Sequence, residues 1–363
     1  MKLLLKKDEE LLYSLRTLYR QYGYRSFRMS KFEKYELYAR NKDFLVSDRV
    51  ITFTDTNGDL LALKPDVTLS IIRNASFRPG LKQKLYYHEN VYRPARNSGR
   101  FREIMQCGLE CIGDLDSYDI FEVLELAEQS LLAISQNYVL SVSHLGILKC
   151  LLNALGAEEE QRKELLRLVA ARSEHELETL FHKEAWDGRK LEDLRTLLHL
   201  SCRLEELPGT LREQEIDWLD ETIWKELEDL SLLCRDGESK ACFDLSVIND
   251  IHYYNGIVFQ GFLQGVAEKV LSGGRYDSLL ERMNRKGSAI GFAVYFGLLE
   301  QILYTGTELD ADVLLLYDND TPMTEVRKTM RSLQEQGCSV SAQRCEEGRY
   351  REIVDLRGGK KHA

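Results

Sequence analysis

Apolar residues recur first at helical spacing and then at strand spacing near the start of the chain. Residues 8–22 place four leucines at helical spacing, which predicts a helix. Residues 50–66 alternate around the pair Asn57-Gly58, the strongest short signal for a β-hairpin. The pattern of residues 66–75 fits a short helix. The chain is therefore expected to begin with a helix, a hairpin and a second helix.

Two longer strands and a longer helix are predicted next. Residues 83–93 and 100–113 have strand character and are separated by a short polar loop, so they predict an antiparallel hairpin. Residues 118–135 return to helical spacing. Asp116 or Ser117 can cap the start of this helix with its side-chain oxygen.

The second half of the chain changes from a helical to a mixed pattern. From about residue 145 to 240, leucines and charged residues alternate at helical spacing, which predicts an all-helical insertion. Strand signals then return, followed by an apolar run that predicts a buried helix and by a tail of strand, helix, strand and strand. The strand segments are residues 244–250, 252–263 and 269–277, the buried helix is 291–304, and the tail elements are 312–318, 324–337, 339–344 and 352–357.

Composition excludes several classes of function. The 363 residues carry a net charge of -10 and no block of Lys and Arg, which argues against a nucleic-acid or membrane surface. The eight cysteines include no CxxC pair and the seven histidines no HxxxH pair, so neither a disulfide framework nor a metal site is predicted. The only apolar run at the start is three leucines, too short for a signal peptide or a membrane span. We expect a cytoplasmic protein without a cofactor.

The strand predicted over residues 100–113 has two different faces. Every second residue from Arg100 to Glu110 shares one face, which begins with Arg100 and Arg102, continues through Gln106 and ends at a carboxylate. The other face is mostly apolar and should pack on helices. The polar face could hold a zwitterion, with its anionic end toward arginine and its cationic end toward Glu110. A solvated edge strand with scattered charges fits the spacing equally well.

Three other segments carry polar side chains at turns. Asp66 and Thr68 stand at a strand-to-helix junction, where such residues commonly cap backbone amides. Tyr254 ends a tyrosine pair beside a turn signal, and such pairs are more often core than ligand contacts. Tyr276 follows two glycines at residues 273–274, a pattern typical of a close backbone approach or of a plain turn. No one segment decides between a ligand site and a structural role.

Taken in order, four segments resemble a known family. Residues 92–113 resemble motif 2 of the class II aminoacyl-tRNA synthetases, and three segments resemble the histidine-specific parts of histidyl-tRNA synthetase: LKPDVT at 63–68, HYYNGIVF at 252–259 and GGRYDSLL at 273–280. The resemblance spans residues 8 to 304 or so. It implies an α+β fold, an antiparallel sheet flanked by helices with the all-helical insertion. The implied domains are residues 1–308 and a truncated α/β unit over 309–363.

The resemblance also implies roles for particular residues. Arg93, Arg100 and Arg102 fall on or near positions that hold the ATP phosphates in the synthetase, and here they could bind phosphate or contribute to an interface. The six positions that match the histidine site of the synthetase are Asp66, Thr68, Gln106, Glu110, Tyr254 and Tyr276.

Other positions depart from the synthetase pattern. The arginine that polarises the forming acyl phosphate corresponds to Asn249, and the motif 3 arginine corresponds to Leu298. Ser30 stands where motif 1 has proline, and the loop after Arg93 is one residue shorter and lacks its acidic residue. Losing one oxyanion donor typically costs roughly 10² to 10³ in rate, and losing a phosphate-neutralising arginine roughly 10³ to 10⁵. These changes predict an amino-acid site without adenylation chemistry.

A synthetase-like chain with this combination and a shortened tail resembles the regulatory subunits of ATP phosphoribosyltransferase. That resemblance implies a subunit in histidine biosynthesis without catalytic residues of its own, which supports a short-form catalytic subunit and takes part in feedback inhibition by histidine. It also implies a dimer within a hetero-octamer. Two alternatives stay open: a divergent histidyl-tRNA synthetase, and a synthetase-like module that senses tRNA or another metabolite.

Overall fold

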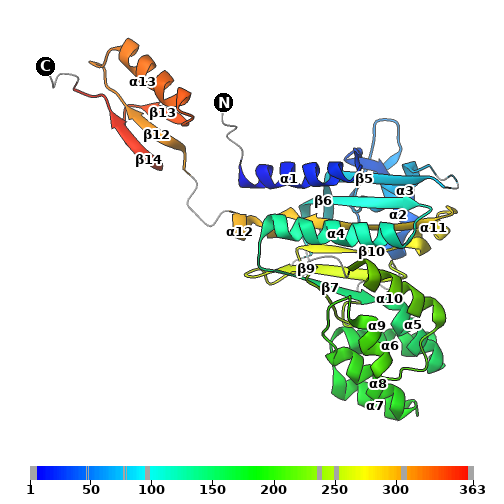
Figure 1. Ribbon diagram of the computed structural model, residues 1–363. Helices are drawn as coiled ribbons and strands as arrows, with labels where there is room; N and C mark the ends of the chain where they lie inside the picture. The colour runs from blue at the N-terminus through cyan, green and yellow to red at the C-terminus, as the bar shows by residue number, and fades with distance from the viewer. Residues whose placement is uncertain are drawn as a thin grey trace. The chain divides into compact units, whose positions relative to one another are not determined.

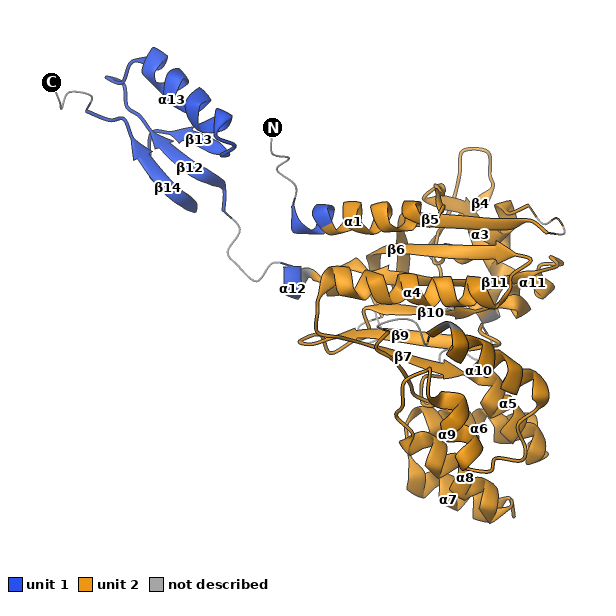
Figure 2. Ribbon diagram, viewed as in Figure 1, with its two compact units in different colours: residues 1–10, 300–363 blue, residues 11–299 orange. Residues whose placement is uncertain are grey.

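The computed structural model divides the chain into two compact units (Figure 2). The larger unit comprises residues 11–299, and the smaller comprises residues 1–10 and 300–363. The domain boundary expected at residues 308 and 309 stays a prediction. The residues that the structure describes are 6–45, 47, 49–76, 78, 80–94, 99–234, 239–248, 253–303 and 309–358.

One large sheet forms the centre of the larger unit (Figure 1). Its described strands run in the order β1-β5-β6-β11-β10-β9-β7-β8. Only the two outer pairs, β1 with β5 and β7 with β8, are parallel, and the five inner pairs are antiparallel. The strands are β1 (Arg25–Ser26), β5 (Lys82–Pro94), β6 (Phe101–Gly113), β7 (Tyr138–His144), β8 (Ala241–Phe243), β9 (Ile257–Leu263), β10 (Leu271–Arg275) and β11 (Ser288–Tyr295).

Two helices, α1 (Lys7–Gln21) and α4 (Ser117–Ile134), run alongside this sheet (Figure 1). Tyr19 of α1 packs its ring 6.0 Å from that of Phe292 on β11, and its hydroxyl lies 3.0 Å from Oγ of Ser130 on α4. The strand face predicted to be apolar meets these helices: Cys107, Leu109 and Cys111 are fully buried. Asp116 caps α4 by accepting the backbone N–H groups of residues 118 and 119, as predicted.

The opposite face of the sheet carries shorter elements. A small antiparallel sheet in the order β2-β4-β3 contains the predicted hairpin around Asn57-Gly58. Helix α3 follows it and buries Leu69, Ile71 and Ile72 in a core that includes Tyr87 and Val91 of β5. These elements are β2 (Phe32–Lys34), α2 (Tyr35–Ala39), η1 (Lys42–Phe44), β3 (Thr52–Thr54), β4 (Leu60–Leu63), α3 (Thr68–Asn74) and α11 (Asp277–Arg282).

Six helices form the insertion, at the lower end of the unit in Figure 1. Each turns a stripe of leucines inward; Leu194 and Leu197 of α8 are fully buried, for example. These described helices are α5 (Leu145–Ala154), α6 (Glu159–Ala170), α7 (Glu174–Lys183), α8 (Gly188–His199), α9 (Leu207–Glu213) and α10 (Glu221–Cys234).

Two predicted elements are wrong. The buried helix expected over residues 291–304 is instead the end of strand β11, a 3₁₀ turn η2 (Phe296–Leu298) and a short α12 (Glu300–Leu303). Because β11 is a central strand buried on both faces, its sequence is apolar without alternation and resembles a buried helix. The strand expected over 244–250 is also absent from residues 244–248, where the chain turns after β8.

The smaller unit contains the predicted strand, helix, strand and strand. All three strands are parallel in the order β13-β12-β14, and the middle strand β12 is the most buried. The elements of its part from residue 309 onward are β12 (Ala311–Leu316), α13 (Met323–Glu335), β13 (Val340–Gln343) and β14 (Tyr350–Asp355).

Candidate amino-acid binding site

A row of glycines makes room on one face of the sheet. Glu110 of β6 pairs in register with Gly291 of β11, which pairs with Gly274 of β10. A Cβ on Gly291 would lie 1.8 Å from Oε2 of Glu110, and a Cβ on Gly274 would lie 2.6 Å from Cδ1 of Tyr254. The Glu110 carboxylate and the Tyr254 ring therefore occupy the space that side chains at positions 291 and 274 would fill.

The carboxylate of Glu110 is buried between two hydroxyl groups. Thr68, the first residue of α3, donates to Oε1 at 2.8 Å, and Tyr276 donates to Oε2 at 2.6 Å. Only 2% of Glu110 is exposed. Burial raises the pKa of Glu110 to about 8, and the charge of nearby Asp66 adds to this, against the two hydrogen bonds, which lower the pKa. The group is therefore mostly protonated at neutral pH.

Asp66 forms the second buried carboxylate of the site. Its Oδ1 accepts the backbone N–H of Leu69 at 3.0 Å, which fixes the start of α3, and its Oδ2 accepts Nη2 of Arg93 at 3.2 Å. Nε of Arg93 also donates to the carbonyl of Pro65 at 2.5 Å. Burial raises the pKa of Asp66, while the Arg93 guanidinium opposes this. Arg93, expected at a phosphate, is thus paired with a carboxylate of the amino-acid site.

Aromatic rings enclose these carboxylates. The ring of Tyr253 lies 4.7 Å from that of Tyr254 and 5.5 Å from that of Tyr276. Tyr87 of β5 stands opposite Gly108 in the register, and a Cβ on Gly108 would lie 2.7 Å from its hydroxyl. Burial raises the pKa of Tyr87, Tyr253 and Tyr276 well above the usual value, with Glu110 contributing in each case. All three phenols are therefore neutral hydrogen-bonding groups.

Comparison with known proteins identifies the family to which this chain belongs. The family model described as histidyl-tRNA synthetase matches residues 4–299. The chain belongs to the histidyl-tRNA synthetase family. A histidine–tRNA ligase of Methanocaldococcus jannaschii is 28% identical over 320 residues, covering 85% of this chain and 74% of the relative. An ATP phosphoribosyltransferase regulatory subunit of Clostridium kluyveri is 27% identical over 350 residues, covering 92% of this chain and 88% of the relative.

A solved structure confirms the fold expected for this family member. It is titled as an ATP phosphoribosyltransferase regulatory subunit/histidyl-tRNA synthetase from Bacillus halodurans C, and superimposes with a TM-score of 0.78 at 23% identity, covering 97% of this chain and 94% of that one. The class II synthetase-like fold predicted from the four motifs is therefore correct.

The structure brings together five of the six residues matched to the family's histidine site. Asp66, Thr68, Glu110, Tyr254 and Tyr276 lie in or against the cluster of carboxylates and rings. Gln106 is buried on the same strand face as Glu110, four residues earlier, a separation of about 13 Å along an extended strand. Tyr253 and Tyr87 are further lining residues that the sequence analysis did not assign.

The other two arginines matched to the phosphate-binding positions, Arg100 and Arg102, lie at the protein surface. Arg102 pairs in register with Arg93 and is exposed, and Arg100 precedes β6 and is also exposed. The motif 3 position, Leu298, is a half-buried residue of η2. Asn249, the other departure from the synthetase pattern, lies outside the described residues.

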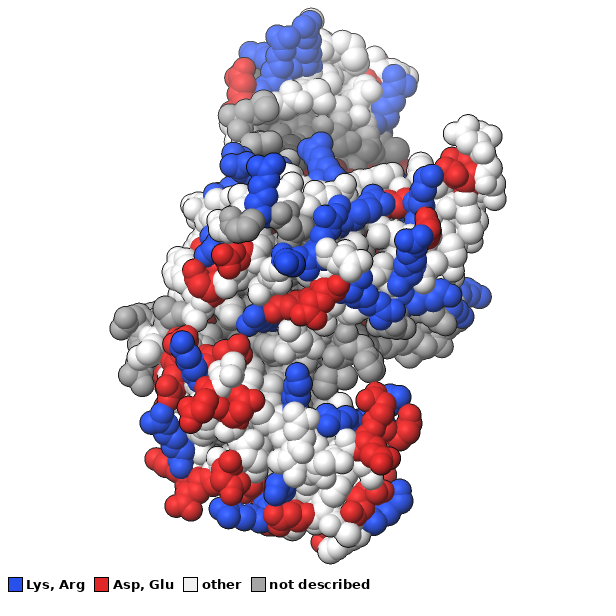
Figure 3. Space-filling model, turned by 90° about the vertical axis from the view of Figure 1, so that its right-hand side faces the viewer, with Lys and Arg blue, Asp and Glu red and all other residues white. Residues whose placement is uncertain are grey.

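Charge is distributed unevenly over the larger unit (Figure 3). Residues 25–102 contain 16 Lys and Arg and 8 Asp and Glu, whereas residues 145–234 of the insertion contain 12 and 21. Acidic side chains are prominent in the lower part of Figure 3, which the insertion forms. Residues 25–102 are therefore a basic segment within a chain whose overall net charge is -10.

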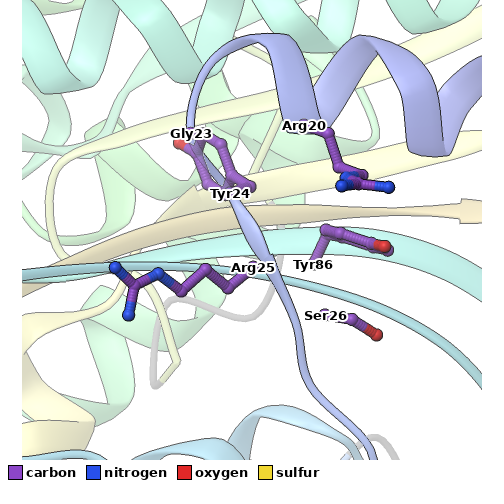
Figure 4. Close-up of a pocket in the computed structure, with 6 residues that line it drawn as sticks. All are labelled: Arg20, Gly23, Tyr24, Arg25, Ser26 and Tyr86. Carbon is purple, nitrogen blue, oxygen red and sulfur yellow. The ribbon is translucent and has the colours of Figure 1, made fainter.

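A hollow of about 420 Å³ lies at the end of α1 (Figure 4). Arg20 and Arg25 extend in opposite directions in this view and do not converge on a common point, so they do not form an anion site. None of the residues matched to the histidine site lines it. The lining residues are Arg20, Gly23, Tyr24, Arg25, Ser26 and Tyr86.

The described residues contain neither a cluster of metal-ligating side chains nor a membrane-spanning helix. No group of three or more His, Cys, Asp and Glu side chains there could hold a metal ion. None of the described helices is long and apolar enough to cross a membrane.

Proposed function

We propose that this chain is a histidine-binding regulatory subunit of ATP phosphoribosyltransferase that contributes no catalytic residue. The observation that carries the proposal is a buried cluster of carboxylates and tyrosines at the positions matched to the family's histidine site, in which Arg93 is paired with Asp66. Leu298, the residue matched to the motif 3 arginine, supports it because it carries no charge. The Clostridium kluyveri regulatory subunit, which covers most of the chain, supports the same assignment. The protein would act in the cytoplasm, in histidine biosynthesis.

The chemistry of the pocket suits an amino acid. Two buried carboxylates, Asp66 and Glu110, can face the ammonium group of a ligand, and a cation near Glu110 would favour its ionised form. Thr68 would add a hydrogen bond to the ligand. Tyr254 and Tyr276 would contact the imidazole. Gln106, which lies farther along β6, would add a hydrogen bond from the other end of the ligand.

The same site is poorly equipped to activate a carboxylate with ATP. Arg93 is half-buried against Asp66, and Leu298 offers no charge. An arginine that neutralises transferring phosphate is worth roughly 10³ to 10⁵ in rate. Arg100 and Arg102 are exposed and would contact a phosphate or a partner subunit. The chain is thus better suited to sense an amino acid than to adenylate it.

The proposed partner is a short-form catalytic subunit, in a hetero-octamer built on dimers of this chain. Histidine bound here can inhibit a distant active site only if it binds one quaternary arrangement more tightly than another. A coupling free energy of about 1 to 3 kcal/mol would be ordinary for such a system.

Reconstitution tests the proposed function. The chain is co-expressed with a short-form ATP phosphoribosyltransferase catalytic subunit, and the formation of phosphoribosyl-ATP is measured with and without histidine. We expect the complex to be more active than the catalytic subunit alone and to be inhibited by histidine. A catalytic subunit that neither associates with this chain nor changes its rate would overturn the proposal.

Calorimetry tests the pocket itself. Histidine is titrated into the wild type and into Glu110→Ala and Tyr276→Phe, with Glu103→Ala and Tyr118→Phe as matched changes at exposed positions. We expect binding to weaken at least tenfold in Glu110→Ala and several-fold in Tyr276→Phe, and to stay within twofold in the two controls. Equal affinity in all five proteins would exclude this pocket.

A divergent histidine–tRNA ligase is the second candidate function. The 28% identity to the Methanocaldococcus jannaschii ligase favours it. Histidine-dependent exchange of pyrophosphate into ATP distinguishes the two functions, because only a ligase forms the adenylate. Exchange above background by the purified chain would establish the ligase and exclude the regulatory proposal in its non-catalytic form.

A further inference from the structure

Arg275 stands where the pocket meets the helical insertion. It is the last residue of β10 and directly precedes Tyr276. Its guanidinium contacts three elements: Nε donates to Oδ2 of Asp277 at 2.7 Å, Nη2 to Oγ of Ser288 at 3.3 Å, and Nη1 to Oε1 of Glu226 on α10 at 3.4 Å. One partly buried side chain thus links the start of α11, the start of β11 and the insertion.

The backbone around Arg275 holds both tyrosines of the pocket. Its carbonyl accepts the N–H of Asn255 at 3.0 Å, and the Asn255 side chain accepts the N–H of Asp277 at 2.8 Å. These bonds tie the residue after Tyr254 to the residue after Tyr276. A Cβ on Gly256 would lie 3.2 Å from Cδ of Arg275, so the arginine stem lies directly on this turn.

Glu226 connects the other end of the link to the start of the insertion. Nε2 of His144 lies 2.9 Å from Oε2 of Glu226, while Nδ1 of His144 accepts the N–H of Gly146 and caps α5. Since Nδ1 is an acceptor, Nε2 carries the proton and donates to Glu226. A Cβ on Gly146 would lie 2.3 Å from Cδ1 of Ile223, so α10 packs closely on this turn.

We propose that Arg275 is a positioning residue, anchored by Glu226, that couples ligand binding in the Glu110–Tyr276 pocket to the position of the helical insertion. A shift of α10 would move Glu226 away from Arg275, and Arg275 would then release the turns that hold Tyr254 and Tyr276. Conversely, a ligand that fixes Tyr276 favours the docked position of α10. This inference rests on the proposed function in taking histidine as the ligand of the pocket.

The test uses a matched pair of substitutions on one helix. Glu226→Gln removes the charge that faces Arg275, whereas Glu228→Gln makes the same change two residues later, where the carboxylate pairs with Arg212 inside the insertion. Histidine affinity is measured by calorimetry on the purified full-length proteins. We expect Glu226→Gln to weaken binding five- to tenfold and Glu228→Gln to change it by less than twofold.

A double-mutant cycle separates positioning from a general loss of structure. If Glu226 acts through Tyr276, then Glu226→Gln should have less than a twofold effect on histidine affinity in the Tyr276→Phe background. Arg275→Lys is a second variant, which keeps the charge but cannot reach three partners from one planar group. It should weaken histidine binding to the same extent as Glu226→Gln.

Hydrogen exchange provides a readout of the coupling itself. On addition of histidine, we expect slower exchange in residues 271–277 and in α10 of the wild type, and unchanged exchange in α7. In Glu226→Gln the protection of α10 should disappear. Equal histidine affinity in Glu226→Gln and Glu228→Gln, or protection of α10 that survives Glu226→Gln, would overturn the inference while leaving the regulatory function intact. A wild-type chain that binds no histidine would overturn both the pocket and this inference.

Discussion

Replacing Glu110 by Gln should make the protein relatively more stable as the pH rises. The folded protein holds a proton on this group up to a pKa of about 8, whereas the unfolded chain releases it near the ordinary value of 4.5. Between these two values the folded state binds more protons than the unfolded state, so its stability falls with increasing pH. Glutamine has the same shape and no charge, and it removes this dependence.

The magnitude follows from the shift. One pKa unit corresponds to about 1.4 kcal/mol, so the full window from 4.5 to about 8 is worth on the order of 5 kcal/mol. Between pH 6 and pH 9 the unfolding free energy of the wild type should fall by roughly 2 to 3 kcal/mol relative to that of Glu110→Gln. Most of this loss should occur between pH 6 and pH 8. At pH 5 the two proteins should differ little, because the buried carboxyl is then protonated.

Urea unfolding at pH 5, 6, 7, 8 and 9 measures this difference. Glu103→Gln is the matched control, since Glu103 lies on the exposed part of the same strand and its hydrogen bonds to Tyr92 and Asn90 lower its pKa. In the wild type, Glu103 is ionised in both the folded and the unfolded state above pH 6, so the difference in unfolding free energy between Glu103→Gln and the wild type should be constant there. Parallel curves for the wild type and Glu110→Gln from pH 6 to 9 would refute the argument that burial holds the proton.

Three further predictions concern the surroundings of the site. Gly291→Ala places a Cβ 1.8 Å from the Glu110 carboxylate, so it should abolish measurable histidine binding in calorimetry and lower the thermal midpoint. Arg93→Met leaves the buried carboxylate of Asp66 uncompensated and should cost about 3 to 5 kcal/mol in urea unfolding at pH 7, with a smaller loss at pH 5, where that carboxyl can protonate. Asp116→Ala removes the cap of α4 and should cost about 1 kcal/mol by the same assay, at either pH.

The sequence predicted elements best where one face is apolar and the other polar. The hairpin of β5 and β6 and the capped helix α4 belong to this group. Polar Gln106 and Glu110 alternate with apolar Cys107 and Leu109 along β6, and Asp116 caps the apolar run of α4. The strand β11 was predicted as a helix because both of its faces are covered, and no period remains in such a run. Strand β7 was missed although Leu140 and Val142 alternate with serines, because it lies between two long helical patterns.

The sequence identified candidate residues of the site, but it did not predict which of them contact one another. Nothing in the sequence indicates that Arg93 pairs with Asp66, since the two are 27 residues apart and meet only when β5 passes the start of α3. Nothing in the sequence distinguishes Tyr87 from the other tyrosines of the same strand. The register that places it opposite Gly108 is a tertiary fact, set by the pairing of β5 with β6.

The electrostatics of the site indicate which ligand it can hold. In the resting protein the charge of Asp66 is balanced by Arg93, and Glu110 is neutral at pH 7, so the pocket carries little net charge. A phosphate entering it would meet the carboxyl groups of Asp66 and Glu110, and Arg93 there is already paired with Asp66. An ammonium group would instead draw Glu110 into its ionised form and gain a charge-assisted hydrogen bond in a low-dielectric site. Under the proposed function, the cluster of Asp66 and Glu110 would favour the cationic end of an amino acid, whereas Arg93 is engaged by Asp66 rather than directed at a nucleotide.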